Sequence, residues 1–202
     1  AGEEYGDWIS RQPLEEWVIH SKPGVELPMA LPPVQQHDLY WAAYFKPALM
    51  LHLLRTEVLG PEVFDRALAE YTEAWSFKHP GPADFFRAME DGAGAKLDWF
   101  WRGWIDTAAR LDHSIEAVWP GDGENPPWIH IRSAGVMIMP VELELTWSDG
   151  RTETVRLPVE MWNLGPDFVY RLPASDARLE AVRLDPRQVY PDDDRSNDGW
   201  NR

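Results

Sequence analysis

The sequence of 202 residues has no cysteine, which excludes disulfide bonds and thiolate chemistry and leaves the redox compartment open. Basic residues are also scarce, because 19 lysines and arginines stand against 34 aspartates and glutamates, and the net charge is -15. Attraction to phosphate drives nucleic-acid binding, and on so acidic a chain it becomes repulsion. The composition therefore predicts no nucleic-acid partner and poor binding to anionic membranes.

Long apolar runs are absent as well. No stretch approaches the roughly 18 apolar residues that a membrane-spanning helix needs, so we expect no membrane span. The first residues, 1–5, lack the basic and apolar regions of a signal peptide. The length fits one large domain or two small ones, and a change of pattern near Leu111 favours two parts.

The common metal and nucleophile motifs are missing too. No two of the six histidines stand four residues apart, and no His-Glu-x-x-His pattern occurs, so the one-helix zinc site is absent. We therefore expect none of the histidines to be a catalytic metal ligand within this chain. His52 lies in an apolar helix, where a histidine needs a hydrogen-bond partner, and we expect it to be a core histidine with such a partner. The six histidines are His20, His37, His52, His79, His113 and His130.

The acidic end of the chain resembles the start of a calcium-binding loop. An EF-hand needs a glutamate at the twelfth position of its loop, and the chain ends before that position. We expect residues 191–202 to form a solvated, loosely ordered acidic tail, with weak calcium binding as the alternative. The residues that suggest the loop are Asp192, Asp193, Asp194, Asn197, Asp198 and Gly199.

The most informative stretch that is present covers residues 40–60, which are apolar on nearly every side. A helix without a polar face is expected inside a helical core. Pro47 has no backbone N–H and disfavours helical angles at Lys46, so we expect the chain to break or kink there. Tyr44 lies beside this irregularity, where its hydroxyl can have a role other than packing in the core. Taken alone, an interior tyrosine is usually a packing residue whose hydroxyl donates to a carbonyl.

Hydrophobic periodicity organises the first half of the chain. Residues 1–37 form a proline-rich lead-in, which we expect to be extended apart from one short helix at 14–19. Residues 38–110 place apolar side chains at helical spacing between loops that contain glycine and proline. This pattern predicts an antiparallel array of four helices.

The second half, residues 111–190, has the period of strands. Asp149-Gly150 stands between two alternating runs, at 141–147 and 154–161, and predicts a β-hairpin. Short strands with frequent turns are typical of a small antiparallel β-sandwich. The fold class is therefore α+β, with the helical array followed by the sandwich. Further strands are expected at 113–119, 128–133, 168–172 and 179–184.

Tryptophan is abundant, with twelve copies. We expect most of them to pack in the core or between elements, because large aromatic side chains dominate apolar burial. A sugar-stacking or peptide-binding face is the alternative interpretation.

The segment Tyr44-Phe45-Lys46-Pro47-Ala48 resembles the Tyr-x-Lys-Gly/Pro helix of the M1 family of zinc metallopeptidases, the aminopeptidase N-like gluzincins. The resemblance continues in order over roughly residues 38–200, through the catalytic helices and into the β-domain that follows them in large bacterial members. Each short motif is moderately specific, and their order is more so. The further motifs are Leu53-Leu54-Arg55, Leu59-Gly60, Phe64 to Tyr71, Trp75 to Pro80, Pro82 to Phe86, Met89-Glu90, Leu97 to Trp104, Leu157 to Trp162, Leu184-Asp185-Pro186 and Pro191-Asp192.

This resemblance implies a role for one residue. In the family, a zinc ion activates water, a glutamate is the general base, and the tyrosine of Tyr-x-Lys stabilises the tetrahedral intermediate. Tyr44 matches that tyrosine. A phenol is protonated at neutral pH and can donate a hydrogen bond to a developing oxyanion. The resemblance thus implies Tyr44 as a catalytic residue, zinc as the cofactor of the intact parent, and a peptide as its substrate.

The departures from the family are as informative. The zinc motif, the zinc-binding glutamate and the Gly-x-Met-x-Asn motif precede the tyrosine in the family and are missing here. The chain therefore resembles a C-terminal fragment, expected to need the N-terminal part of the catalytic domain and to be inactive alone. A non-catalytic binding module or pseudopeptidase is the alternative. The residues leave the compartment unknown, and only the resemblance to exported bacterial proteins implies a periplasmic or extracellular one.

Overall fold

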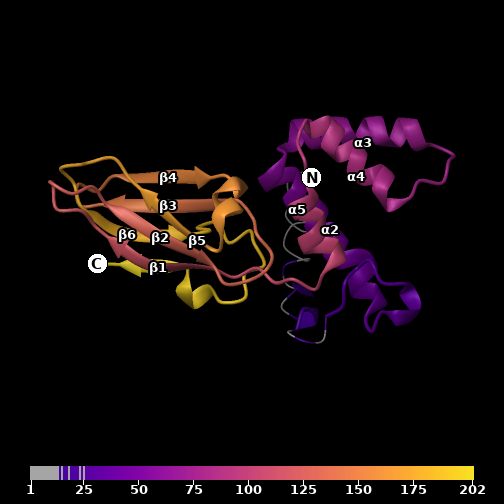
Figure 1. The fold of residues 1–202 in the computed structure, drawn as a ribbon, viewed down its shortest axis with the longest axis horizontal. Coiled ribbons are helices and arrows are strands. Elements are labelled where there is room, and N and C mark those ends of the chain that lie inside the picture. Colours follow the sequence, from indigo (N-terminus) through magenta and orange to yellow (C-terminus); the bar gives the residue numbers. More distant parts are fainter. Residues whose placement is uncertain (1–13, 15, 18, 23, 25) are drawn as a thin grey trace, which may run out of the picture. The chain divides into compact units, whose positions relative to one another are not determined.

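The fold was analysed in a computed structural model, which describes residues 14, 16, 17, 19–22, 24 and 26–202. The chain divides into two compact units, Ala1–Ala108 and Ala109–Arg202. The first unit is helical, and the second is a β-sandwich of two antiparallel sheets, so the fold class is α+β as predicted (Figure 1). In the described part of the chain, no helix is both long and apolar enough to cross a membrane.

The helical unit is built from α-helices that are interrupted or extended by π-helical turns. Its core contains aromatic and aliphatic side chains of the α-helices and of the π-turns, with Leu49, Phe64, Met89 and Trp104 almost completely buried. The elements are the 3-10 turn Pro33–Gln35, the π-turn Trp41–Phe45, α2 Lys46–Leu53, the π-turn Leu54–Val58, α3 Pro61–Trp75, α4 Pro82–Ala93, α5 Asp98–Trp101 and the π-turn Arg102–Asp106.

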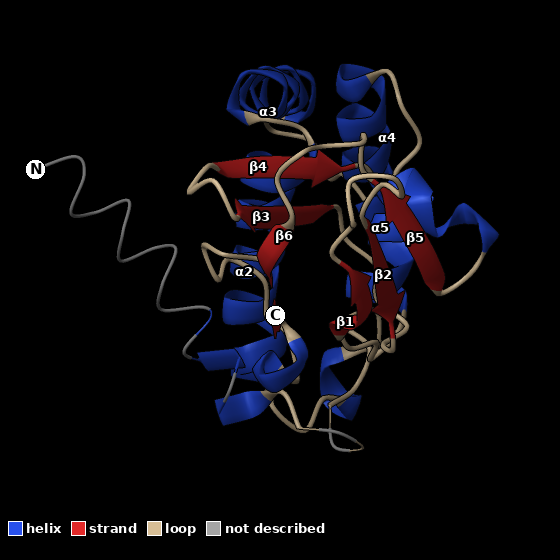
Figure 2. Ribbon diagram, turned by 90° about the vertical axis from the view of Figure 1, so that its left-hand side faces the viewer, coloured by secondary structure: helices blue, strands red, loops and turns tan. Residues whose placement is uncertain are grey.

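Helices α3 and α4 pack against each other and are neighbours in both views (Figure 1 and Figure 2). Gly60 takes a positive φ of 80°, which suits the end of the preceding helix, and Pro61 is the first residue of α3. Gly92 allows the two helices to approach, since a Cβ atom there would lie 2.5 Å from the Cβ of Ala67. The small residues at this crossing therefore set the distance between the helices.

The β unit contains a three-stranded sheet of order β1-β2-β5 and a four-stranded sheet of order β4-β3-β6-β7. Apolar side chains from both sheets form one core, in which Ile129, Leu143, Leu145 and Val182 are fully buried. The strands are β1 His113–Trp119, β2 Trp128–Ser133, β3 Val141–Trp147, β4 Thr152–Leu157, β5 Asp167–Arg171, β6 Leu179–Leu184 and β7 Gly199–Asn201.

The predicted hairpin is present between β3 and β4. Thr146 pairs with Thr152, and Gly150 in the turn has a φ of 83°, which glycine adopts without strain. The second strand is shorter than predicted, however. It ends at Leu157, and residues Val159–Leu164 form a 3-10 helix. Pro158 cannot donate a ladder hydrogen bond, which explains why the alternation beyond it does not continue the strand.

The end of the chain is ordered, so the prediction of a loosely ordered tail is wrong. Residues Arg195–Asn197 form a 3-10 turn and Gly199–Asn201 form β7, which pairs with β6. Strand pairing satisfies backbone groups that an acidic composition alone would leave to water. Trp200 faces the core of the sandwich, and this apolar anchor offsets the local charge.

Candidate functional site

Tyr44 lies on an exposed side of the segment that the sequence predicts to be a buried helix. Its side chain is 64% exposed, as is that of Tyr40, and the two rings lie 5.1 Å apart at 42°. The opposite side is buried through Trp41, Leu49 and residues further along α2. The expectation of an all-buried helix is therefore wrong at its beginning, because two tyrosines one turn apart form a polar, accessible face.

The proline does not break the helix. Lys46 keeps helical angles, with φ of -61° and ψ of -47°, so the predicted loss of helical geometry at this residue is wrong. The irregularity is instead a π-turn, Trp41–Phe45, closed by a hydrogen bond from the Lys46 N–H to the Trp41 carbonyl. A wider turn relieves the contact between a proline ring and the preceding carbonyls, which in a regular α-helix would produce a kink.

Lys46, two residues after Tyr44, is among the most buried side chains of the protein. Its ammonium forms an ion pair with Glu26, and the exposed fractions of the two side chains are 1% and 4%. The second carboxylate oxygen of Glu26 accepts a hydrogen bond from the Ser21 hydroxyl. The Lys46 ammonium also lies 5.8 Å from the centre of the Trp17 ring, within the range of a cation–π contact.

The proline-rich lead-in that carries Glu26 is part of the helical unit. Trp17 is buried, and its ring meets those of Trp41 and Trp104 edge-on at 5.6 Å and 5.7 Å. Further along, the N–H of Ala30 donates to the Ile105 carbonyl over 3.1 Å. Sequence reasoning missed this packing, and the available signal was a tryptophan in a short helical run.

A second polar cluster surrounds His20. Its Nδ1 lies 2.6 Å from Asp38 and its Nε2 lies 3.1 Å from Glu16, while the ring stacks on Trp41 at 5.7 Å. Asp38 also accepts a hydrogen bond from the Trp41 N–H over 2.9 Å, and this bond is the largest cause of the lowered pKa of the Asp38 carboxyl. A pocket of about 40 Å³ beside the cluster is the size of a water site.

The remaining histidines do not assemble into a metal site. Burial lowers the pKa of His52, which favours the neutral ring. His130 lies 2.9 Å from Asp167 on the β unit, and His113 is buried against Trp162. Within the described residues, no three histidine, aspartate or glutamate side chains are placed to hold a metal ion.

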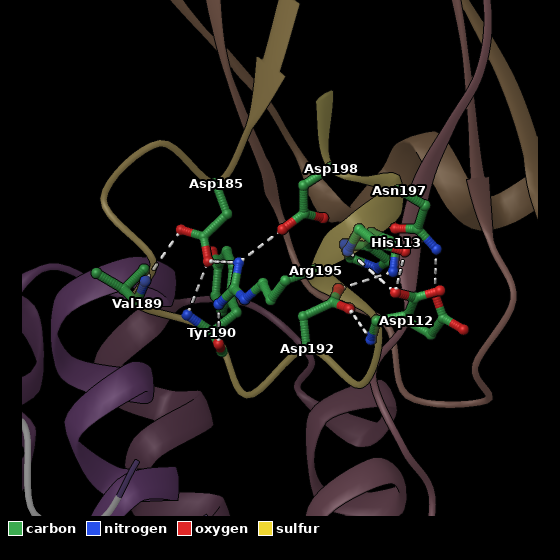
Figure 3. A network of polar contacts seen from close by, with 11 residues as sticks. Asp112, His113, Asp185, Val189, Tyr190, Asp192, Arg195, Asn197 and Asp198 are labelled. Carbon is green, nitrogen blue, oxygen red and sulfur yellow. Dashed lines mark hydrogen bonds and ion pairs between the residues drawn. The ribbon is translucent and has the colours of Figure 1, made fainter. Parts of the chain in front are cut away.

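The acidic end of the chain forms a network in the β unit (Figure 3). The Arg195 guanidinium lies 2.9 Å from Asp185 and 3.0 Å from Asp198, and it donates a further bond to the Tyr190 carbonyl. Asp192 accepts from the backbone N–H of His113 over 2.9 Å. These contacts pin the last residues to β1 and to the loop after β6.

Burial shifts the titration of this network. It raises the pKa of Asp192 to about 6 and lowers the pKa of His113 to about 3. The Nε2 atom of His113 has no hydrogen-bond partner in the described part of the chain. The residues suggested as a calcium loop pair with two arginines, Arg195 and Arg110, and with backbone groups, as expected of a structural network.

Comparison with known proteins gives a likeness of fold. No family model matches the sequence, and no curated protein matches it. The structure is similar to that of aminopeptidase A from Legionella pneumophila, solved in complex with aspartic acid, with a TM-score of 0.57 and 16% identity. The similarity covers 77% of this chain, and the chain spans only 18% of the length of that protein. At this identity, the likeness shows that the fold is shared with part of an aminopeptidase.

Proposed function

We propose that this chain is the C-terminal portion of a zinc-dependent aminopeptidase of the M1 type, which hydrolyses peptide bonds. The observation that carries the proposal is the exposure of Tyr44 on the helix whose sequence resembles the Tyr-x-Lys helix of that family. The fold shared with part of an aminopeptidase supports it independently. The partner of this chain is then the N-terminal part of the same catalytic domain.

Zinc does not fit the residues that the structure describes, since they contain no cluster able to hold a metal ion. In the proposal, the zinc ligands and the general base belong to another segment of the parent or to another chain. The contribution of this chain is one hydrogen-bond donor. The Tyr44 hydroxyl would donate to the oxygen that becomes negatively charged when the peptide carbonyl is attacked.

The test compares two tyrosines in the same helix. Joined to its upstream coding segment, the protein would be assayed for release of an N-terminal amino acid from a chromogenic amide. Removal of one oxyanion donor typically costs about 2.7 to 4 kcal/mol, so Tyr44→Phe should lower kcat by about 10² to 10³. Tyr40→Phe is the matched control, because Tyr40 is equally exposed one turn earlier, and it should retain the parental rate. Equal rates for all three proteins would remove the role of Tyr44.

One observation favours a second candidate, a binding module. On the outward side of the three-stranded sheet, Trp119 pairs with Trp128, which in turn pairs with Arg171. Trp119 is 40% exposed, and indole rings beside a guanidinium can stack on sugar rings. A parent that lacks the zinc motif, together with loss of binding to a soluble polysaccharide in Trp119→Ala, would favour this function over peptide hydrolysis.

A further inference from the structure

The spacing between Tyr44 and Lys46 has a geometric consequence. Each residue of an α-helix turns the chain by about 100°, and each residue of the wider π-turn turns it somewhat less, so residues two apart lie on nearly opposite sides in either geometry. The structure shows this opposition, since the Lys46 side chain is buried while Tyr44 is 64% exposed. Whatever fixes the direction of Lys46 therefore also fixes the direction in which Tyr44 points.

Glu26 supplies that fixed point. It lies in the lead-in, 20 residues before Lys46, and the lead-in is anchored by the buried ring of Trp17 and by the hydrogen bond from Ala30 to Ile105. The carboxylate is further oriented by the Ser21 hydroxyl. The ion pair thus joins the lead-in, at a residue between these two attachment points, to the first residue of α2.

The backbone at this point needs such a restraint. The π-turn Trp41–Phe45 ends on the Lys46 N–H, and π-turns are rare, short features that are frequent at functional sites. A π-turn shifted by one residue would rotate Tyr44 by about 100° and bring a different side chain to the exposed face. An apolar side chain at position 46 would be buried equally well in several such arrangements, whereas an ammonium must meet its carboxylate.

A buried ion pair is weak evidence for stability, because desolvation of two charges offsets their attraction. Its best-attested use is to select one register among several. We propose that Lys46, through its ion pair with Glu26, is a positioning residue that sets the rotation of the helix and so presents Tyr44. The kinetic part of this inference rests on the proposed function, and its structural part does not.

The structural part can be tested on this chain alone by nitration of tyrosines with tetranitromethane, mapped by mass spectrometry. Glu26→Lys and Lys46→Glu each place like charges together, and each should lower the nitration rate of Tyr44 at least threefold while leaving Tyr170 of the β unit unchanged. The exchanged pair, Glu26→Lys with Lys46→Glu, should restore the rate. Unchanged Tyr44 reactivity in folded single variants, or no restoration in a folded exchanged pair, would overturn the proposal.

The variant Glu26→Gln with Lys46→Met covers the case in which the single variants do not fold. It removes both charges at similar side-chain size, so it should fold with a Tm close to that of the parent and still show at least threefold slower nitration of Tyr44. Lys96→Met is the matched control, because Lys96 also pairs with a carboxylate, Glu90 at 2.8 Å, but is exposed. Parental Tyr44 reactivity in the doubly neutral variant would contradict the role of the ion pair.

The kinetic part uses the protein joined to its upstream segment. The doubly neutral variant should lower kcat at least fivefold with little change in KM, and it should have no further effect in a Tyr44→Phe background, because it acts through that hydroxyl. Equal fold losses of kcat in both backgrounds would overturn positioning through Tyr44. An upstream-joined protein without peptidase activity would instead refute the proposed function, and the nitration rates would still decide the role of the ion pair.

Discussion

His113 should make the β unit sensitive to mild acid. The ring is completely buried, and burial lowers its pKa from 6.5 to about 3. When the pH falls below 6.5, the unfolded chain binds a proton on this histidine and the folded chain does not. The contribution of His113 to the free energy of unfolding therefore falls as the pH falls from about 6.5 to 3.

The size of the effect follows from these two pKa values. At pH 5 the pH is 1.5 units below the pKa of the histidine in the unfolded chain. Proton binding therefore stabilises the unfolded state by about 2 kcal/mol, while the folded histidine is still neutral. Replacement by phenylalanine removes the titration and keeps a flat ring against Trp162, whose centre lies 5.0 Å away. When the pH is lowered from 7.5 to 5, the free energy of unfolding of His113→Phe should therefore fall by about 2 kcal/mol less than that of the parent.

Asp192 acts in the opposite direction. Burial raises its pKa from 3.8 to about 6, so the folded state binds a proton first as the pH falls. The stabilisation from this group is complete below pH 3.8 and is lost as the pH rises through 6. Comparison of the parent with His113→Phe at each pH cancels the effect of Asp192, and Asp192→Asn should deepen the acid loss of the parent.

Hydrogen exchange measured by mass spectrometry on peptides from β2 and β3 gives the required comparison in the full chain. Differences between parent and variant at one pH are free of the intrinsic pH dependence of exchange. Protection in the parent relative to His113→Phe should fall by a factor of about 30 between pH 7.5 and pH 5, which corresponds to about 2 kcal/mol. Equal losses of protection in the two proteins would refute the assignment of the acid response to His113.

Two further predictions concern packing in the helical unit. Gly92→Ala should destabilise it by about 1 to 3 kcal/mol, because the new methyl group would overlap Ala67, and thermal unfolding measures the loss. Gly81→Ala is its control, with no atom closer than 3.7 Å, and a normal Tm for Gly92→Ala would contradict the packing. Trp17→Ala should cost about 3 to 5 kcal/mol in urea unfolding. The exposed Val34→Ala should cost almost nothing, and equal midpoints for these two variants would show that the lead-in does not belong to the core.

The strands were predictable because their signal is local. Alternating side chains identified residues 113–119, 128–133 and 179–184 with the bounds that the structure has. The hairpin at Asp149-Gly150 was predictable for the same reason, since the turn sequence and the flanking alternation lie within a few residues. The prediction failed where a single residue ended the pattern, as at Pro158, or where pairing with a distant strand ordered a polar segment, as in β7.

The candidate site was only half predictable, and Lys46 shows why. The position of Tyr44 in the chain was found from a short motif, but its exposure depends on which side of the helix is buried. That choice is made by Glu26, 20 residues earlier in a segment without periodicity, and by the burial of Trp17 beside it. Local rules consider only the lysine followed by proline, and from that pair alone they predict a broken helix. The structure resolves the conflict with a π-turn and a buried carboxylate, which together direct the tyrosine outward while the helix continues.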